Sequence, residues 1–369
     1  MLEKIQLARP WFDERENEAV RRVLASGWVV QGPEVEAFEA EIARLHQVRH
    51  CVAASSGTAA LHLCYLTLGI GPDDAVFIPS FAWPSAANMA KLVGAKPIFV
   101  DVLPDTYNID AEDLERRIRE CIRRGWGRPT AVVPVHEFGL AAEMDKILPI
   151  AVHHSLKVIE DAACAFGATY KGRPVGNFGT MAVLSFHPRK SITTGEGGAV
   201  LTNDHELAER CRLWRNHGQR VKNGQRDFVL PGLNYRLTDI QAAIGRIQLA
   251  KFPGILEKRR FLASEYFRLL SGHSGVELPL DVPEQTWQTF MVVLGEEPNR
   301  DGVIAGMASQ GVEAAPGSVA AHLGNHFHTE ADLPSASRLH RYGVALPLYP
   351  GLEPGLVPRI VTALCSNLA

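Results

Sequence analysis

The chain has 369 residues, of which 46% are hydrophobic and 21% are charged, and its formal net charge is −3. This length suits two or three domains with a large core, and the composition is that of a soluble globular protein. The small net charge predicts neither nucleic acid nor a membrane surface as a partner. The one basic cluster, residues 116–128, contains Glu120 and is predicted to be a solvated helix end.

The cysteines and the N-terminal residues indicate in which cellular compartment we expect the protein. Six cysteines occur without a CxxC pair, which argues against a zinc site or a disulfide framework and favours a reducing compartment. Residues 1–6 contain no apolar run, so we expect no signal peptide. The longest nearly uncharged stretch, residues 75–90, contains two prolines and is not a membrane span. We therefore expect a cytoplasmic protein with no metal.

Short apolar strands alternate with helices in the first part of the chain. A helix is predicted from Pro33, because proline suits the first helical turn; its apolar face holds Val35, Phe38, Ile42 and Leu45. The expected strands are 50–54, 75–78, 97–102, 131–135, 157–160, 181–184 and 199–202. The expected helices are 59–68, 85–93 and segments within 142–156, interrupted at Pro149. This alternation predicts an α/β domain with a mostly parallel sheet, which binds ligands beyond the carboxyl ends of its strands.

The pattern changes after residue 239, and we place a domain boundary near Lys251. A break at Phe252-Pro253 separates two predicted helices. The expected elements are helices 239–249 and 255–270, strands near 288–294, and helices 301–310 and 355–364. We assign residues 1–250 to a large domain and 251–369 to a smaller one. Whether the N-terminal segment packs on the small domain is left open.

Lys190 lies in a glycine-rich connection between two predicted buried strands. A lysine held near the core loses its proton more easily than a surface lysine, and a neutral amine can form a Schiff base. The alternative is a surface lysine in a hairpin, which describes most lysines.

Three further features follow predicted strands and are placed to converge with Lys190. Ser56-Gly57-Thr58 opens a helix, where backbone N–H groups suit a phosphate, although N-capping alone explains these residues too. Asp161 ends a buried strand and either pairs with a protonated ring nitrogen or caps a helix. Trp83 either stacks on an aromatic ring or serves the core or an interface. Taken together, these are the contributions that pyridoxal phosphate (PLP) requires from a protein.

The sequence resembles the DegT/StrS-type sugar aminotransferases, a branch of the fold-type I PLP-dependent transferases. The segments that carry the resemblance are 55–61, 79–83, 94–101, 133–136, 160–163, 185–190, 194–198, 216–218 and 232–239. It is specific from about residue 27 to residue 251 and looser beyond. It implies a large α/β/α cofactor-binding domain and a smaller C-terminal α+β domain.

The resemblance also implies roles for single residues. Lys190 matches the lysine that forms the internal aldimine, Asp161 the partner of the pyridine nitrogen, and Trp83 the residue stacked on the ring. The phosphate contacts it implies are Gly57, Thr58 and Ser185. Asn234 matches a residue that reaches the phosphate of the neighbouring subunit's cofactor, which implies a homodimer with a shared active site.

Three positions depart from the family pattern. Cys164 stands near the expected phenolic oxygen of the cofactor, where Gln or His is usual, and a thiol is a weaker hydrogen-bonding group. Residues 288–290 read Gln-Thr-Phe where a His-x-Tyr pair is usual, and residues 312–317 lack an expected arginine. The first departure bears on cofactor tuning, and the other two bear on nucleotide-sugar recognition.

Retention of Lys190 favours transamination over the dehydration performed by relatives with histidine at that position. His187 does not match that replacement and is interpreted as structural. The expected function is PLP-dependent transfer of an amino group from an amino acid, which the resemblance implies is L-glutamate, to a ketosugar linked to a nucleotide. The alternatives are a ketocyclitol or other non-nucleotide acceptor, a PLP-dependent sugar dehydratase or lyase, and a non-catalytic PLP-binding regulator.

Overall fold

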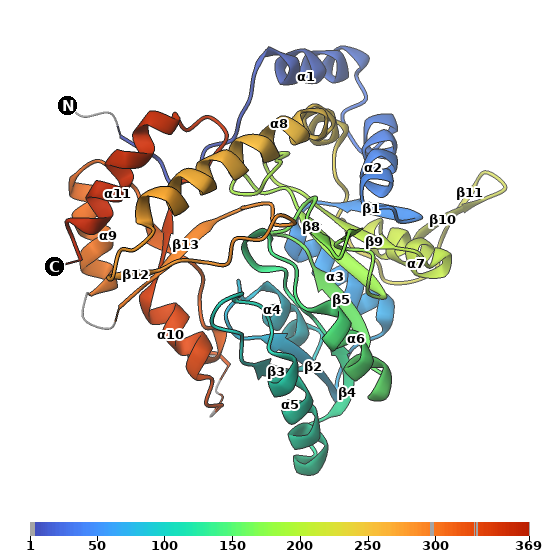
Figure 1. Cartoon of the computed structure of the whole chain (residues 1–369). Helices are drawn as coiled ribbons and strands as arrows, with labels where there is room; N and C mark the ends of the chain where they lie inside the picture. Colours follow the sequence, from blue (N-terminus) through green and yellow to red (C-terminus); the bar gives the residue numbers. More distant parts are fainter. Residues whose placement is uncertain (1–3, 296–298, 328, 330, 369) are drawn as a thin grey trace.

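A mixed sheet of seven strands forms the centre of the large domain in the computed structural model, which describes residues 4–295, 299–327, 329 and 331–368 (Figure 1). The strands are β1 (His50–Ala54), β2 (Asp74–Pro79), β3 (Lys96–Val100), β4 (Arg128–Val132), β5 (Lys157–Asp161), β8 (Met181–Ser185) and β9 (Gly198–Thr202). Their order is β1-β9-β8-β5-β4-β2-β3. β9 is antiparallel to β1 and β8, whereas the other neighbours pair in parallel. The predicted α/β class and mostly parallel sheet are confirmed.

Helices cover both faces of this sheet, so alternate residues of a strand enter different cores. The helices of this domain are α2 (Pro33–Leu45), α3 (Gly57–Leu68), α4 (Ser85–Leu92), α5 (Ala111–Arg124), α6 (Met144–His153) and α7 (His205–Arg215). Val76 and Ile78 of β2 pack with α3 and α4, whereas Ala75 and Phe77 pack with α5 and α6. Burial on both faces leaves the strand ends as the place for a ligand.

The C-terminal part of the chain forms a second sheet with its own core. The strand order is β12-β13-β15-β14. These strands are β12 (Val276–Glu277), β13 (Phe290–Leu294), β14 (Ala315–Pro316) and β15 (Gly343–Leu346), accompanied by α9 (Arg300–Ser309), α10 (Pro334–Tyr342) and α11 (Val357–Cys365). Ile5 forms a bridge with Val312 and is buried in this core, so the start of the described chain packs here.

One helix, α8 (Asp239–Leu270), belongs to both cores (Figure 1). The predicted break at Phe252-Pro253 is wrong. Ala242 packs in the core of the large domain, and Tyr266 packs in the core of the small one. Proline removes one helical hydrogen bond, but packing on both sides of Pro253 keeps the helix continuous. In the described part of the chain, no helix combines the length and apolarity needed to cross a membrane.

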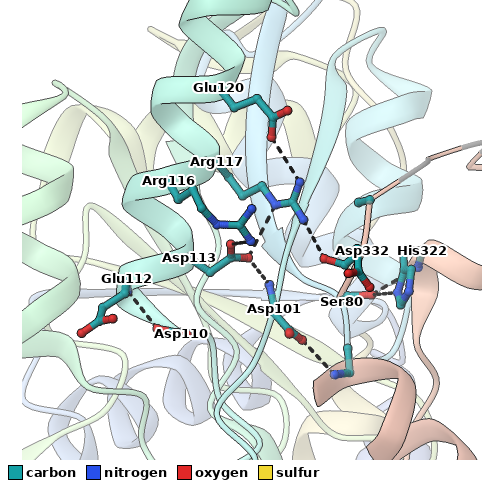
Figure 2. Close-up of polar contacts among 12 residues, drawn as sticks. Ser80, Asp101, Asp110, Glu112, Asp113, Arg116, Arg117, Glu120, His322 and Asp332 are labelled. Carbon is teal, nitrogen blue, oxygen red and sulfur yellow. Dashed lines mark hydrogen bonds and ion pairs between the residues drawn. The ribbon is translucent and has the colours of Figure 1, made fainter. Parts of the chain in front are cut away.

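The basic cluster at 116–128 is only partly a solvated helix end, because Arg117 of α5 is 5% exposed. Arg117 donates a hydrogen bond to the backbone oxygen of Asp332 at 3.0 Å and forms ion pairs with Asp113 and Glu120 (Figure 2). A buried guanidinium requires such partners. They join α5 to the segment that precedes α10.

The Asp113 carboxylate continues this network to the end of β3. It accepts a hydrogen bond from the backbone N–H of Asp101 at 2.7 Å (Figure 2). The Asp101 carboxylate in turn accepts from the N–H groups of Ser335 and Ala336, at the start of α10. Helix N-termini leave such N–H groups without helical partners. Asp101 therefore fixes the small domain against the carboxyl edge of the large sheet.

Candidate active site

A cavity of about 450 Å³ lies at the carboxyl ends of β1, β5 and β8. Most of the predicted site residues line it: Gly57, Thr58, Trp83, Asp161, Cys164, Ser185 and Lys190. Asn234 does not line it, and its exposed side chain lies in a segment bridged to Asn216. The sequence predicted only that these residues follow successive strands. The structure shows that they line one cavity.

Two glycines allow the backbone around the start of α3 to pack closely. A Cβ atom on Gly57 would lie 2.9 Å from the Cβ of Ser185, and one on Gly198 would lie 2.5 Å from the backbone of Ser56 and Gly57. Any side chain at position 198 would push β9 away from the N-terminus of α3. The close approach places Ser185, at the end of β8, against the first residue of α3.

This junction has the groups that bind a phosphate. The Ser56 hydroxyl caps α3 by accepting from the N–H of Ala59 at 3.0 Å. The Thr58 hydroxyl lies 3.2 Å from that of Ser85, and both residues line the cavity. N–H groups and the dipole at a helix N-terminus favour an anion. We call Ser56-Gly57-Thr58 together with Ser185 the phosphate cradle.

Asp161 is buried at the end of β5. Its carboxylate accepts from the N–H of Ala163 at 3.1 Å. Burial raises the pKa of Asp161, although that hydrogen bond and the charge of Lys190 act in the opposite direction. A buried carboxylate is stabilised by a nearby cation, and a protonated ring nitrogen would supply one.

A buried pair, His136 and Glu160, fixes the backbone next to Asp161. His136 Nε2 lies 3.0 Å from Glu160 Oε2, and His136 Nδ1 accepts from the N–H of Ala142, so Nε2 donates. Burial favours the neutral form of Glu160, but His136 and backbone N–H groups lower its pKa below the ordinary value. The N–H of His136 donates to the backbone oxygen of Asp161 at 3.0 Å. The pair therefore fixes the strand end that carries Asp161.

Lys190 donates a hydrogen bond from Nζ to Cys164 Sγ at 3.0 Å. Burial alone would lower the pKa of Lys190, but Cys164, Glu137 and Asp161 outweigh burial and raise it. The expectation that Lys190 loses its proton more easily than a surface lysine is therefore wrong for this arrangement. The lysine is close to the core as predicted, and the neighbouring acids favour its charged form.

Trp83 is 71% exposed and lines the cavity, which excludes a role in the core of this chain. Its loop is held by the small domain: the N–H of Ala82 donates to the oxygen of Val319, and the Ser80 hydroxyl lies 2.6 Å from His322 Nδ1 (Figure 2). An exposed indole on a fixed loop is suited to stack on a ring.

Several residues that line the cavity were given no role from the sequence. They are Ser85, Val135, Glu137, Phe138, Arg189, Glu196, Thr289 and Ser318. Val135, Arg189 and Glu196 lie within segments that carry the family resemblance, and Glu137 directly follows one of these segments. His187 also lines the cavity, while its Nδ1 accepts from the N–H of Arg189 within the turn. Gln288 lies between the domains, and its amide donates to the oxygen of Arg189 at 2.8 Å.

The model of the DegT/DnrJ/EryC1/StrS aminotransferase family matches residues 10–365. The chain belongs to this family. Its members are PLP-dependent aminotransferases, so this protein is one as well. The match extends through the small domain, where the sequence resemblance was loose.

Solved structures share this fold over nearly their whole length. A DegT DnrJ EryC1 StrS aminotransferase from Brucella abortus is 35% identical, with a TM-score of 0.90, over 96% of this chain and 95% of its own. The PLP form of Spr1654 from Streptococcus pneumoniae, described as a sugar aminotransferase, is 25% identical, with a TM-score of 0.92, over 99% and 98%. DesI, solved with its TDP-sugar product, is 29% identical, with a TM-score of 0.90, over 100% and 94%.

The cavity of this aminotransferase fits PLP. The phosphate cradle suits the phosphate, and the buried Asp161 carboxylate suits a protonated pyridine nitrogen. Trp83 has the exposure needed to cover the ring, and Lys190 has the amine for a Schiff base. When bound, PLP supplies a ring that accepts electrons from the substrate.

Gly198→Ala is expected to weaken PLP binding at least about tenfold, because the new methyl group forces the cradle backbone apart. Titration of the cofactor-free protein with PLP, followed by absorbance, measures the affinity. Gly254→Ala in α8 is the matched control, since a Cβ there meets open space. Unchanged affinity in a folded Gly198→Ala protein would contradict the assigned cradle.

Proposed function

We propose that this aminotransferase takes an amino group from L-glutamate and transfers it to the keto group of a nucleotide-linked sugar. The observation that carries the proposal is the single cavity in which Lys190 and Asp161 lie beside a phosphate cradle. Similarity to DesI, solved with a TDP-sugar product, supports the nucleotide-linked acceptor. We place the reaction in the cytoplasm, because all six cysteines are free thiols, and cell fractionation tests this placement.

In this proposal the Lys190 amine would take the proton from the α-carbon of the amino donor and hold it at Nζ. The acids around Lys190 favour its charged form, so they help it to hold the proton after it is removed. Asp161 keeps the ring nitrogen protonated, and the His136–Glu160 pair keeps Asp161 in place. Trp83 orients the ring from the exposed side of the cavity.

Lys190→Ala is expected to lower turnover by about 10²–10⁴-fold while PLP still binds, because the base is lost and the cradle is intact. Formation of 2-oxoglutarate from glutamate and the absorbance of the bound cofactor are the measurements. Lys157→Ala, at the opposite end of β5 from the cavity, is the control. Normal turnover by Lys190→Ala would overturn the assignment.

A ketocyclitol or other non-nucleotide acceptor is the second candidate. Gln288 stands where the family has a histidine, and its amide is engaged by the backbone oxygen of Arg189. This engagement leaves less of the side chain to contact a nucleotide.

A nucleotide-linked ketosugar and the same ketosugar without its nucleotide separate the two candidates. For a nucleotide-sugar enzyme, removal of the nucleotide is expected to lower kcat/KM by about 100-fold or more, because remote binding energy is lost. Equal kcat/KM values for the two acceptors would support the non-nucleotide candidate.

We also propose a homodimer in which Asn234 of one subunit contacts the phosphate of the other subunit's cofactor. The exposure of Asn234 outside its own cavity supports this arrangement. Lys190→Ala and Asn234→Asp proteins, each of low activity, are expected to regain about a quarter of wild-type activity when their subunits are mixed. Each mixed dimer then holds one intact site. Failure to regain activity would place both residues in the same subunit's site.

A further inference from the structure

Glu137 is a second buried carboxyl in the active-site cavity, in addition to Asp161. It has no role in the cofactor contacts or in the proton transfer proposed above. It begins the short helix η1 (Glu137–Gly139), is 4% exposed and lines the same cavity as Lys190. A glutamate is almost never buried to this extent without a partner or a task.

The backbone around Glu137 is held firmly from both domains. The N–H of Glu137 donates to the Asn108 side chain at 2.8 Å. Phe138 has a φ of 53°, which a bulky residue adopts only when its surroundings impose it. The surroundings here are backbone hydrogen bonds from Thr286 to Gly139 and from Gln288 to Phe138. The position of Glu137 is therefore imposed by the fold and is not the result of a mobile loop.

Burial favours the protonated form of Glu137. Burial, with a smaller contribution from Asp161, raises the pKa of Glu137 to about 8, while Lys190 and a hydrogen bond from Ser318 act in the opposite direction. Cys164 also interacts with it electrostatically. The other titratable groups lining the cavity are His187, Arg189 and Glu196. At neutral pH Glu137 is thus mainly a neutral carboxylic acid, which can donate a hydrogen bond.

The position of Lys190 locates the reacting atoms. With PLP bound, Lys190 would hold the cofactor through its Nζ, and the transferred amino group would take the place of that nitrogen. The keto carbon of the acceptor must approach that place, so its oxygen meets the groups that surround Lys190. These groups include the Cys164 thiol, which is a weak donor, and the Glu137 carboxyl, which is a stronger one.

We propose that Glu137 is a further catalytic residue, which donates a hydrogen bond to the keto oxygen of the acceptor and protonates that oxygen as it leaves. The inference rests on the proposed function. As the carbon–nitrogen bond forms and the carbon–oxygen bond breaks, the oxygen leaves as water with two protons that begin on nitrogen. Glu137 relays one of them: it gives its own proton to the oxygen and takes one from the nitrogen. The enzyme ends the step unchanged.

The aminated holoenzyme mixed rapidly with 2-oxoglutarate, a keto acid, tests this role through the absorbance of the cofactor. For the wild type, the rate constant is expected to decline as pH rises through about 8, where Glu137 loses its proton. Glu137→Gln is expected to be slower by about tenfold or more at pH 7, and to lack this decline, because an amide cannot relay a proton. Glu18→Gln, which changes an exposed carboxyl outside the cavity, should keep the wild-type profile.

Ser318→Ala provides a variant that is expected to extend the reaction to higher pH, an effect that general damage to the enzyme would not produce. The Ser318 hydroxyl stabilises the charged form of Glu137, so its loss is expected to move the decline in rate to higher pH. Infrared difference spectra of the cofactor-free protein provide a readout that is independent of activity. They should show a neutral carboxylic acid that ionises between about pH 7 and 9 and is missing in Glu137→Gln.

The outcomes separate the two proposals. If the wild type reacts with neither glutamate nor 2-oxoglutarate, the proposed donor is wrong, and the infrared result still decides the protonation of Glu137. If the wild type reacts and Glu137→Gln keeps its rate and its pH profile, the catalytic role of Glu137 is overturned. The role is also overturned if the infrared band is absent from the wild type.

Discussion

Lys190 shares one cavity with Asp161, Glu137 and the Cys164 thiol, and burial raises the pKa of each of these acids. Charge balance in this small volume constrains the rest of the active site. Each of these acids, when ionised, favours the charged form of Lys190, and the charge of Lys190 in turn acts to lower the pKa of each acid. A protonated ring nitrogen would add positive charge beside Asp161, and the phosphate cradle would hold the negative charge of the phosphate. The His136–Glu160 pair holds the strand end that carries Asp161, and His136 also acts to lower the pKa of Asp161.

Contacts between the two domains also position residues that line this cavity. The segment around Ser318 reaches Glu137, and Gln288 reaches the backbone beside Lys190. Asp101 and Arg117 fix the small domain at positions remote from the reacting atoms. Both domains therefore line the cavity, and two of the three departures from the family pattern, residues 288–290 and 312–317, lie in the small domain.

The location of the site could be predicted from the sequence because parallel strands bring their carboxyl ends to one edge. Lys190, Asp161 and the cradle residues each follow a buried strand, and their residue types narrowed the chemistry to one cofactor. The pKa of Lys190 could not be predicted in this way, because its direction depends on Glu137 and Cys164, whose proximity is a tertiary property. The helix α1 (Glu14–Ser26) was overlooked although Asp13 and Glu16 form a capping box that is visible in the sequence.

Other elements carried no sufficient local signal. Helix α10 begins with N–H groups that Asp101 satisfies from more than two hundred residues away, so no nearby cap announces it. Prolines 149 and 253 were interpreted as breaks, yet α6 and α8 continue through them because both helices are held by packing. In each case a tertiary contact outweighs the local preference of the chain.

The continuity of α8 has a consequence for how this molecule is divided. A helix whose two halves lie in different hydrophobic cores transmits the loss of either core to the other. We therefore expect the two domains, although distinct in architecture, to unfold together. A chain cut near residue 251 would expose the apolar face of half a helix and is not an independent enzyme. The boundary predicted near Lys251 lies within α8, at the point where this continuous helix passes from the core of the large domain to the core of the small domain.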